Sequence, residues 1–306
     1  MLKGGIIILK QSLQITIYLI IIMSIVGFWP IAYSDTQTNT FNPFQNLTMR
    51  LIKDGFDEQF IHELYQQKDV YFNVSSVSGY FQHNEASLNY NQFLEPYAIN
   101  KAWKYIQKHF SQLSKVEKKY GVNKEVIAAI LLVETQLGSY TGNSRVINTY
   151  SSMASLKDES VRDRLWEEIP SEKRLSKDQY IAKANSKSDW AYTELKSFLT
   201  YVQREKMDPL TVKGSYAGAL GICQFIPSSV LRYAVDGNKD GKVDLFNESD
   251  AFESIANYLT KFGWKNRLSL KKKAKILLNY NRSSYYVDTI IAVANKLHKY
   301  KKHHKK

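Results

Sequence analysis

One carboxylate in this sequence stands where an apolar residue is expected. Glu134 lies near the end of a predicted helix from about Lys124 to Leu137, in the segment GVNKEVIAAILLVETQLG. It falls on the same three- and four-residue stripe as the apolar side chains that must face the core. Burial and the negative end of the helix dipole both predict a raised pKa for this carboxyl group, which a general acid needs at neutral pH. A glutamate on the helix rim, exposed or paired with a lysine, is the alternative that this helix alone leaves open.

A second stretch with chemical potential is a loop rich in glycine and proline, KGSYAGALGICQFIPSS. Its glycines let the backbone approach a ligand closely, and Ser215, Gln224 and Ser228 offer neutral hydrogen-bonding groups. A glycine-rich turn that binds nothing is the alternative. The loop has no lysine at the offset that a phosphate-binding loop requires, so we do not expect nucleotide binding.

The segment DGNKDGKVDLFN has the spacing of the first half of an EF-hand calcium loop. Gly241 stands where such a loop turns sharply, but Asn247 replaces the usual bidentate glutamate at position twelve. We therefore expect the following helix to close the coordination sphere around a structural calcium ion. An Asx-rich turn without metal is the alternative. The predicted ligands are Asp236, Asn238, Asp240, the Lys242 carbonyl and Asp250.

Aromatic residues gather in the tract ILLNYNRSSYYVDTI, just before a helix predicted to start at Ser283 or Ser284. The chain contains 21 tyrosines in all. Because a tyrosine ring stacks on sugar rings while its hydroxyl group forms hydrogen bonds, the tract favours a carbohydrate groove. Ordinary packing of these rings in the core and at its rim is the alternative.

The elements that must position these residues are predicted to be mainly α-helical with irregular connections, and no internal repeat is present. Asn123 is predicted to cap the central helix and Gly138 to end it. Residues 70–92 are expected to form a loop or short strand, GNSRVINTYSSMASL a polar connection, and residues 157–187 a charged insertion. Apolar residues recur at helical spacing behind Asp57 and over residues 98–118, 192–202, 251–262 and 285–297.

The N-terminus predicts export. Lys3 and Lys10 precede an apolar run at residues 13–31, and small residues follow it, so residues 1–34 are predicted to be a signal peptide or a signal anchor. Residues 35–48 are predicted to be a linker. Cys223 is the single cysteine, so an intrachain disulfide and a lipid anchor after the signal are both excluded.

The charge of the chain points to an acidic partner. Forty-two Lys and Arg against 29 Asp and Glu give a net charge of +13, to which a basic tail at 299–306 contributes. The hydrophobic content of 44% is that of a globular protein. Nucleic acid is not the expected partner, because an exported chain with these loops has no recognised nucleic-acid-binding motif.

Together these stretches resemble the lytic murein transglycosylase B family, periplasmic enzymes with a lysozyme-like catalytic core. The resemblance is colinear over about residues 50–298 and implies a catalytic domain at 49–298, with its calcium loop at 236–250. It rests on VETQLG, KGSYAGALGICQFIPSS, DGNKDGKVDLFN, SIANYLTKFGW and NYNRSSYY. Cys223 departs from the small residue usual in the family, and 157–187 is longer than in the family. The resemblance implies that Glu134 is the sole catalytic acid and base, and that Ser215, Gln224, Tyr258, Tyr280, Asn281, Tyr286, Tyr90 and Trp190 line the glycan groove.

The reaction that the resemblance implies is non-hydrolytic cleavage of the β-1,4 bond between N-acetylmuramic acid and N-acetylglucosamine of peptidoglycan. It leaves a 1,6-anhydromuramoyl end and needs no cofactor for chemistry. The sequence offers no second acid at a comparable position on an apolar stripe, although most glycosidases use two carboxylates. A lysozyme-type hydrolase and a non-catalytic protein that binds the cell wall are the alternatives.

Overall fold

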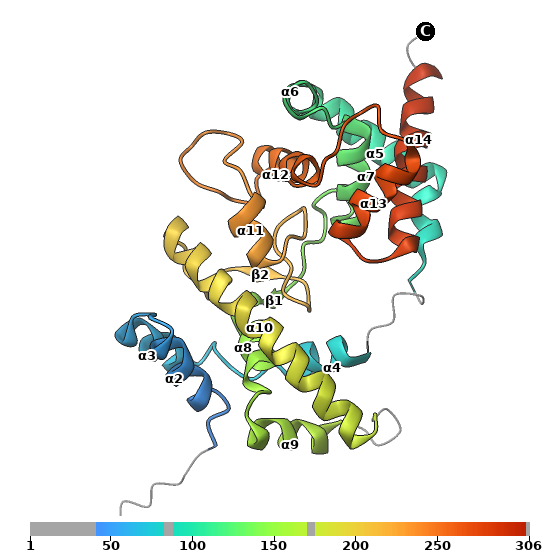
Figure 1. The fold of residues 1–306 in the computed structure, drawn as a ribbon. Coiled ribbons are helices and arrows are strands. Elements are labelled where there is room, and N and C mark those ends of the chain that lie inside the picture. The colour runs from blue at the N-terminus through green and yellow to red at the C-terminus, as the bar shows by residue number, and fades with distance from the viewer. Residues whose placement is uncertain (1–40, 83–87, 170–174, 304–306) are drawn as a thin grey trace, which may run out of the picture. The chain divides into compact units, whose positions relative to one another are not determined.

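The computed structural model describes residues 41–82, 88–169 and 175–303 (Figure 1). The chain divides into two units, Met1–Phe41 and Asn42–Lys306, and every element discussed below belongs to the second unit. The predicted export signal lies outside the described residues, as does the linker up to residue 40. Helix α2, Gln45–Lys53, begins inside the predicted linker and buries Leu47 and Leu51, so the end of that segment is helical.

Helix α7, Lys124–Thr135, is the central element of this unit, as the sequence predicts. Every residue from Lys124 to Leu132 is buried. A helix that is apolar around its whole circumference must be covered on all sides. The helices that pack against it are α5 (Pro96–Lys108), α6 (Phe110–Tyr120), α12 (Glu248–Lys261) and α14 (Ser284–His303).

The end of α7 differs from the prediction. The helix stops two residues before Leu137, because Gln136 and Leu137 have left-handed backbone conformations with φ of 51° and 66°. Thr135 fixes this turn from within: its hydroxyl group donates to the Ile222 carbonyl at 2.8 Å and accepts from the Gly138 amide at 3.0 Å. The turn therefore holds the last helical residues, Glu134 among them, against the glycine-rich loop.

Helix α8, Val146–Ser155, occupies the segment predicted to be a polar connection, and that prediction is wrong. All ten of its residues are buried, and it packs against the long helix α10, Lys177–Glu205 (Figure 1). Several of its polar side chains form hydrogen bonds inside the protein. Ser152 Oγ accepts from the Asn73 amide at 2.7 Å, and Asn148 Nδ2 donates to the Asp69 carbonyl at 2.8 Å.

Other helices also differ from the sequence-based expectations. Helix α4, Val74–Gln82, lies in the segment 70–92 predicted to be loop or strand, and the 3-10 helix η2, Tyr90–Leu94, begins in it. The predicted helix over 98–118 is interrupted at His109, between α5 and α6. The charged insertion contains α9, Glu159–Glu168, and the start of α10.

The remaining predicted helices are confirmed, with changed bounds. Asp57 caps α3, Glu58–Gln66, by accepting from the Phe60 amide at 2.7 Å. Helix α12 includes the predicted segment 251–262 up to Lys261, and α14 begins at Ser284. Because α14 continues to His303, the predicted basic tail is helical at its start. Helices α11, Pro227–Tyr233, and α13, Leu270–Tyr280, complete the set in the described chain.

The described strands form one small antiparallel pair, β1 (Ser144–Arg145) and β2 (Lys213–Gly214). The two backbones approach so closely beside this pair that a Cβ atom on Gly142 would lie 2.0 Å from the Gly214 carbonyl oxygen. The pair joins the segment after α7 to the glycine-rich loop. The mainly α class is thus confirmed, and none of the helices in the described ranges is both long and apolar enough to cross a membrane.

Candidate active site

A cavity of about 550 Å³ lies at the C-terminal end of α7. It is bounded by η2, by the segment leading to β1, by the glycine-rich loop and by the start of α14. Four segments far apart in the sequence therefore meet around the end of one buried helix. Six of the predicted site residues line the cavity: Tyr90, Glu134, Ser215, Gln224, Asn281 and Tyr286.

Glu134 is the only Asp or Glu among the described residues that line this cavity. Its side chain is partly exposed, in contrast to the buried side chains of Ile130, Leu131 and Leu132 in the preceding turn. Its neighbours are tyrosines, phenylalanine, serines and amides, and the described lining contains no lysine, arginine or histidine. Glu134 is thus a single ionisable carboxyl group in a cavity of neutral hydrogen-bonding and aromatic side chains.

Tyr286 lies next to this carboxyl group and is only 1% exposed. Its ring stacks on Tyr280 with 6.2 Å between centroids and 12° between planes. Burial first, and then the negative charge of Glu134, raise the pKa of Tyr286 well above its usual value. The phenol therefore stays protonated and remains a hydrogen-bond donor beside the carboxyl group.

The glycine-rich loop presents Ser215 and Gln224 to the cavity, and both side chains also shape the loop. Ser215 Oγ accepts from the Ala219 amide at 3.0 Å. Gln224 Nε2 donates to the Gly221 carbonyl at 2.8 Å and to the Thr141 carbonyl at 3.2 Å. The two residues hold the loop in a fixed curve while they face the same cavity as Glu134.

Three residues that the resemblance placed in the groove do not line the cavity. Tyr280 and Tyr258 belong to an aromatic cluster with Phe225, in which their ring centroids lie 5.0 Å apart. The Tyr280 hydroxyl group donates to the Cys223 carbonyl at 2.6 Å, and the Tyr258 hydroxyl group to the Asn279 carbonyl at 2.6 Å. Trp190 packs edge-on against Tyr150. In this structure, Tyr258 and Tyr280 support the wall of the cavity from behind.

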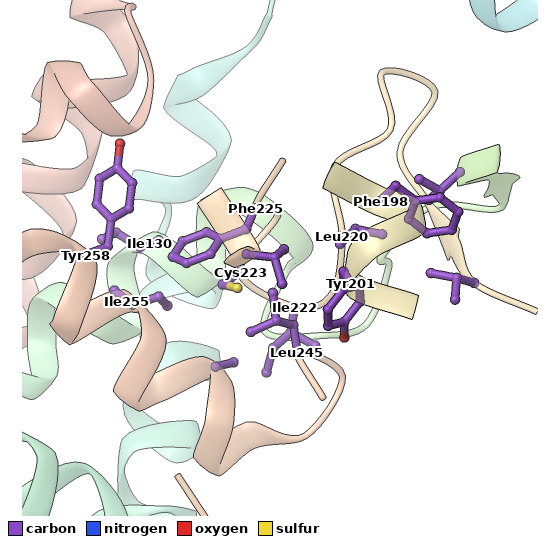
Figure 2. Packing of buried hydrophobic residues seen from close by; sticks show 14 of the residues in the cluster. Ile130, Phe198, Tyr201, Leu220, Ile222, Cys223, Phe225, Leu245, Ile255 and Tyr258 are labelled. Carbon is purple, nitrogen blue, oxygen red and sulfur yellow. The ribbon is translucent and has the colours of Figure 1, made fainter. Parts of the chain in front are cut away.

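Cys223 is completely buried, and its side chain packs with Phe225, Ile222 and Leu245 in the core behind the loop (Figure 2). Burial raises the pKa of this thiol, so it stays protonated. The larger side chain at this position of the loop is accommodated by apolar packing and does not project into the cavity.

The cavity also has lining residues that the sequence reasoning did not single out. Tyr140 is 70% exposed and Tyr216 is 40% exposed, and both rings stand at the cavity. Each had a signal in the sequence: Tyr140 follows VETQLG after one serine, and Tyr216 follows Ser215 in the loop. Phe93 and Asn143 had no such signal, because Asn143 lies in the predicted polar connection and Phe93 lies between the predicted loop at 70–92 and the predicted helix at 98–118.

Several acids are buried elsewhere in the described fold: Glu125, Glu194, Glu205 and Asp250. One of them lies on an apolar helix face, contrary to the sequence-based expectation. Glu194 in α10 is 3% exposed and accepts hydrogen bonds from the amide and the hydroxyl group of Ser228, at 2.8 and 2.7 Å. Burial raises its pKa. Glu194 does not line the cavity, so it anchors the start of α11 and leaves Glu134 as the single described acid at the site.

The predicted calcium loop folds as a compact turn closed by its own acidic side chains. Asp236 accepts hydrogen bonds from the amides of Lys239, Asp240 and Gly241. Asp250, which is 1% exposed, accepts from three further loop amides. Within the described ranges no group of three or more His, Cys, Asp or Glu side chains is arranged to hold a metal ion. A metal here would depend on the Asn238 side chain and the Lys242 carbonyl as well.

This loop is joined to the site by backbone hydrogen bonds. The Ile222 amide donates to the Leu245 carbonyl at 2.9 Å, and the Ile222 carbonyl accepts from Thr135, the neighbour of Glu134. Glu205 in α10 also anchors this loop, because its Oε2 accepts a hydrogen bond from the Val243 amide at 3.0 Å. Through these hydrogen bonds, the turn at 236–247 supports the glycine-rich loop.

Comparison with known proteins agrees with this geometry. Residues 40–276 match the family model described as the Transglycosylase SLT domain. The chain is 30% identical over 237 residues to the membrane-bound lytic murein transglycosylase B of Escherichia coli K12, which covers 74% of this chain and 58% of that protein. The chain thus spans less than two thirds of the length of this curated relative.

Solved structures share the fold. The soluble lytic transglycosylase SltB1 of Pseudomonas aeruginosa superposes with a TM-score of 0.68 at 22% identity, over 84% of this chain and 98% of that chain. The Escherichia coli lytic transglycosylase Slt35 in complex with calcium superposes with a TM-score of 0.65 at 21% identity, over 85% of this chain and 94% of that chain. These matches confirm the expected lysozyme-like helical fold. With the family match over most of its length, the chain belongs to the Transglycosylase SLT domain family.

Proposed function

We propose that this protein is a peptidoglycan lytic transglycosylase and that Glu134 is its catalytic acid and base. The observation that carries the proposal is the single described carboxyl group in a cavity lined by tyrosines, serines and amides. Glycosidases that use two carboxylates place them about 5 to 10 Å apart across the scissile bond. A site with one acid favours a reaction in which the same group acts twice, and the family match and the named relative support this reading.

The proposed steps balance without a cofactor. Protonated Glu134 donates its proton to the glycosidic oxygen while the bond from that oxygen to C1 of N-acetylmuramic acid breaks. The resulting carboxylate accepts the proton of the C6 hydroxyl group of the same sugar as its oxygen bonds to C1. The product is a 1,6-anhydro ring, and Glu134 ends protonated, as it began.

The other cavity residues are proposed to bind and orient the glycan. Ser215, Gln224 and Asn281 offer neutral hydrogen-bonding groups, and Tyr286 offers a phenol that stays protonated. The rings of Tyr90, Tyr140 and Tyr216 offer faces for sugar stacking at the cavity. Tyr258 and Tyr280 act on the substrate only through the wall that they support.

A lysozyme-type hydrolase would use the same Glu134 with a bound water, and a wall-binding protein would use the cavity without turnover. Digestion of purified peptidoglycan sacculi, followed by mass analysis of the released fragments, separates these possibilities. We expect fragments with anhydro ends, which are lighter than reducing ends by one water. Reducing ends would support the hydrolase, and intact sacculi that retain the protein would support the binding protein.

We further propose that the enzyme is exported and that its loop at 236–250 holds one structural calcium ion. The apolar N-terminal run and the membrane-bound relative support export. The donor set supports calcium, since carboxylate, amide and carbonyl oxygens are the ligands this ion prefers. Burial and the nearby negative charge of Asp236 both raise the pKa of Asp250. A cation beside the two carboxylates would therefore stabilise their charged forms. The calcium complex of Slt35 is a precedent in a protein of the same fold.

A further inference from the structure

A groove of about 570 Å³ lies between the first turn of α5 and the last described turns of α14. We call it the Tyr97 groove, and its lining includes Leu94, Tyr97, Asn100, Lys296, Lys299 and Tyr300. Tyr97 is 80% exposed, the largest exposed fraction among the large apolar side chains of the described residues. No part of the proposed chemistry uses this groove.

The groove carries positive charge and aromatic surface together. Lys296 and Lys299 are exposed, and no Asp or Glu is found among the described residues of the lining. Lys296 Nζ donates to the Leu94 carbonyl at 3.1 Å, which fixes its ammonium group at the edge of the groove. The Tyr300 ring packs against Trp103 with 5.7 Å between centroids. The groove therefore fits a ligand that bears carboxylates and can lie against aromatic rings.

One side of helix α14, which carries Tyr285, Ala292 and Lys296, runs from the catalytic cavity to this groove. Tyr285 and Lys296 are eleven residues apart, so they lie on the same side of the helix and about 17 Å apart along its axis. Tyr285 is 56% exposed and stacks on Tyr90 with 6.5 Å between centroids. Because Tyr90 lines the cavity, a ligand that leaves the cavity past this pair of rings and follows α14 passes Asp288 and then reaches the two lysines.

We propose that the Tyr97 groove binds the carboxylates of a stem peptide whose glycan strand occupies the cavity. An extended peptide of about five residues spans about 17 Å, which matches the distance along α14. The proposal rests on the proposed function, and it makes Tyr97 and Lys299 determinants of substrate preference rather than catalytic residues. The cavity would then bind the glycan strand while the Tyr97 groove binds its stem peptide.

The test compares two substrates for one double variant, Tyr97→Ala with Lys299→Ala. The substrates are soluble glycan strands with their stem peptides and the same strands stripped of stems by an amidase. We expect KM to rise about three- to tenfold on strands with stems at unchanged kcat, because exposed ion pairs are individually weak. On stripped strands both constants should stay within about twofold of wild type. Lys118→Ala, on the exposed face of α6, is the matched control and should change neither.

Salt provides a second readout, since the difference between the two substrates should shrink as ionic strength rises from about 0.05 to 0.5 M. Equal effects of the double variant on both substrates, or none on strands with stems, would overturn the proposal. So would unchanged kinetics combined with lost sedimentation on phosphatidylglycerol vesicles, which would assign the lysines to a membrane surface. Turnover of stripped strands by the wild type tests the proposed function separately, because those strands have no ligand for the groove.

Discussion

Among single residues, Glu134 stands out because the fold separates its carboxyl group from every other described acid at the cavity. Glu134 is the last residue but one of α7, it follows the buried residues from Lys124 to Leu132, and no second described acid lines its cavity. Sequence reasoning found this residue because a charged side chain on an apolar stripe is costly unless it is used. It did not find Glu194, because that acid lies on a helix with mixed polarity and is satisfied by Ser228.

We predict that Glu134→Gln removes turnover of sacculi. The amide keeps the shape and most hydrogen bonds of the side chain but has no proton to transfer, so the rate should fall by at least about 10² to 10⁴. Release of soluble fragments measures the effect. Glu125→Gln, at the opposite end of the same helix and outside the cavity, is the control and should retain activity. Activity of Glu134→Gln within a few-fold of wild type would contradict the assignment.

A second prediction at this scale concerns Thr135→Val. The substitution removes the hydroxyl group that donates to the Ile222 carbonyl and accepts from the Gly138 amide. Loss of partners for buried polar groups should lower the free energy of unfolding by about 1 to 3 kcal/mol. Denaturant unfolding measures this change. Thr193→Val, on the exposed face of α10, should shift it by less than about 0.5 kcal/mol, and equal effects of the two would exclude a special role for the turn.

At the scale of elements, the sequence predicted some segments well and others badly, for identifiable reasons. Helix α7 was recognisable because its apolar residues are continuous, and α3 because Asp57 caps it. Helix α8 was missed because its serines, threonine and asparagine were interpreted as exposed, whereas they are buried and several form tertiary hydrogen bonds. Helix α4 was missed for a similar reason, since serine and glycine have weak helix propensity.

The candidate site was predictable to the extent that its residues lie in local motifs. Ser215, Gln224, Asn281 and Tyr286 stand beside turns or helix starts that the sequence shows, and the structure brings them to the cavity. Whether a tyrosine faces the cavity or the wall depends on tertiary packing. Tyr280 belongs to the same motif as Asn281 and Tyr286, and Tyr258 to SIANYLTKFGW, yet their hydroxyl groups donate to backbone carbonyls behind the cavity.

The close packing of the glycine-rich loop can be tested by comparing two glycines that share a backbone conformation but differ in their surroundings. Gly221 and Gly121 have nearly the same left-handed φ, 68° and 66°. A Cβ atom on Gly221 would lie 2.4 Å from Leu245 Cβ, whereas one on Gly121 would meet nothing within 4 Å. Gly121→Ala should therefore cost about 1 kcal/mol of stability from the backbone alone, measured by chemical denaturation.

Gly221→Ala should cost clearly more than its partner and should also impair turnover. The contact with Leu245 cannot be relieved without moving the loop segment that carries Gln224, which lines the cavity. Unfolding curves and sacculus digestion on both variants give the comparison. If the two variants were equally stable and equally active, the close approach of the loop to Leu245 would not be a constraint on the site.

In the folded unit as a whole, the segments that line the cavity differ from the turn that supports the glycine-rich loop from behind. The cavity draws on segments from η2 to α14, while the turn at 236–247 lies behind the glycine-rich loop and contributes no lining residue. Its contact with the site is indirect, through Leu245, Ile222 and Thr135. An ion in this turn would therefore act on the stability of the folded unit and would not contact the sugar.

We predict that chelation of calcium lowers the melting temperature of the protein. An ion that binds only the folded state at a hundredfold excess over its dissociation constant adds about 2.7 kcal/mol of stability by mass action. For a domain of this size that corresponds to about 5 to 10 °C. Melting curves in excess calcium and in excess chelator measure the shift. In the variant with Asp236→Asn and Asp240→Asn, the two curves should coincide, because two predicted ligands have lost their charge.

The same experiment distinguishes a structural ion from a catalytic one. At a temperature where the calcium-free protein stays folded, Thr135 still holds the Ile222 carbonyl and the cavity keeps Glu134 as its acid, so most turnover should remain. Melting curves that chelator and calcium leave unchanged would remove the metal site. A rate that vanished on chelation with the fold intact would instead mean that the hydrogen-bonded path from Leu245 to Thr135 sets the position of Glu134 only when the turn is occupied.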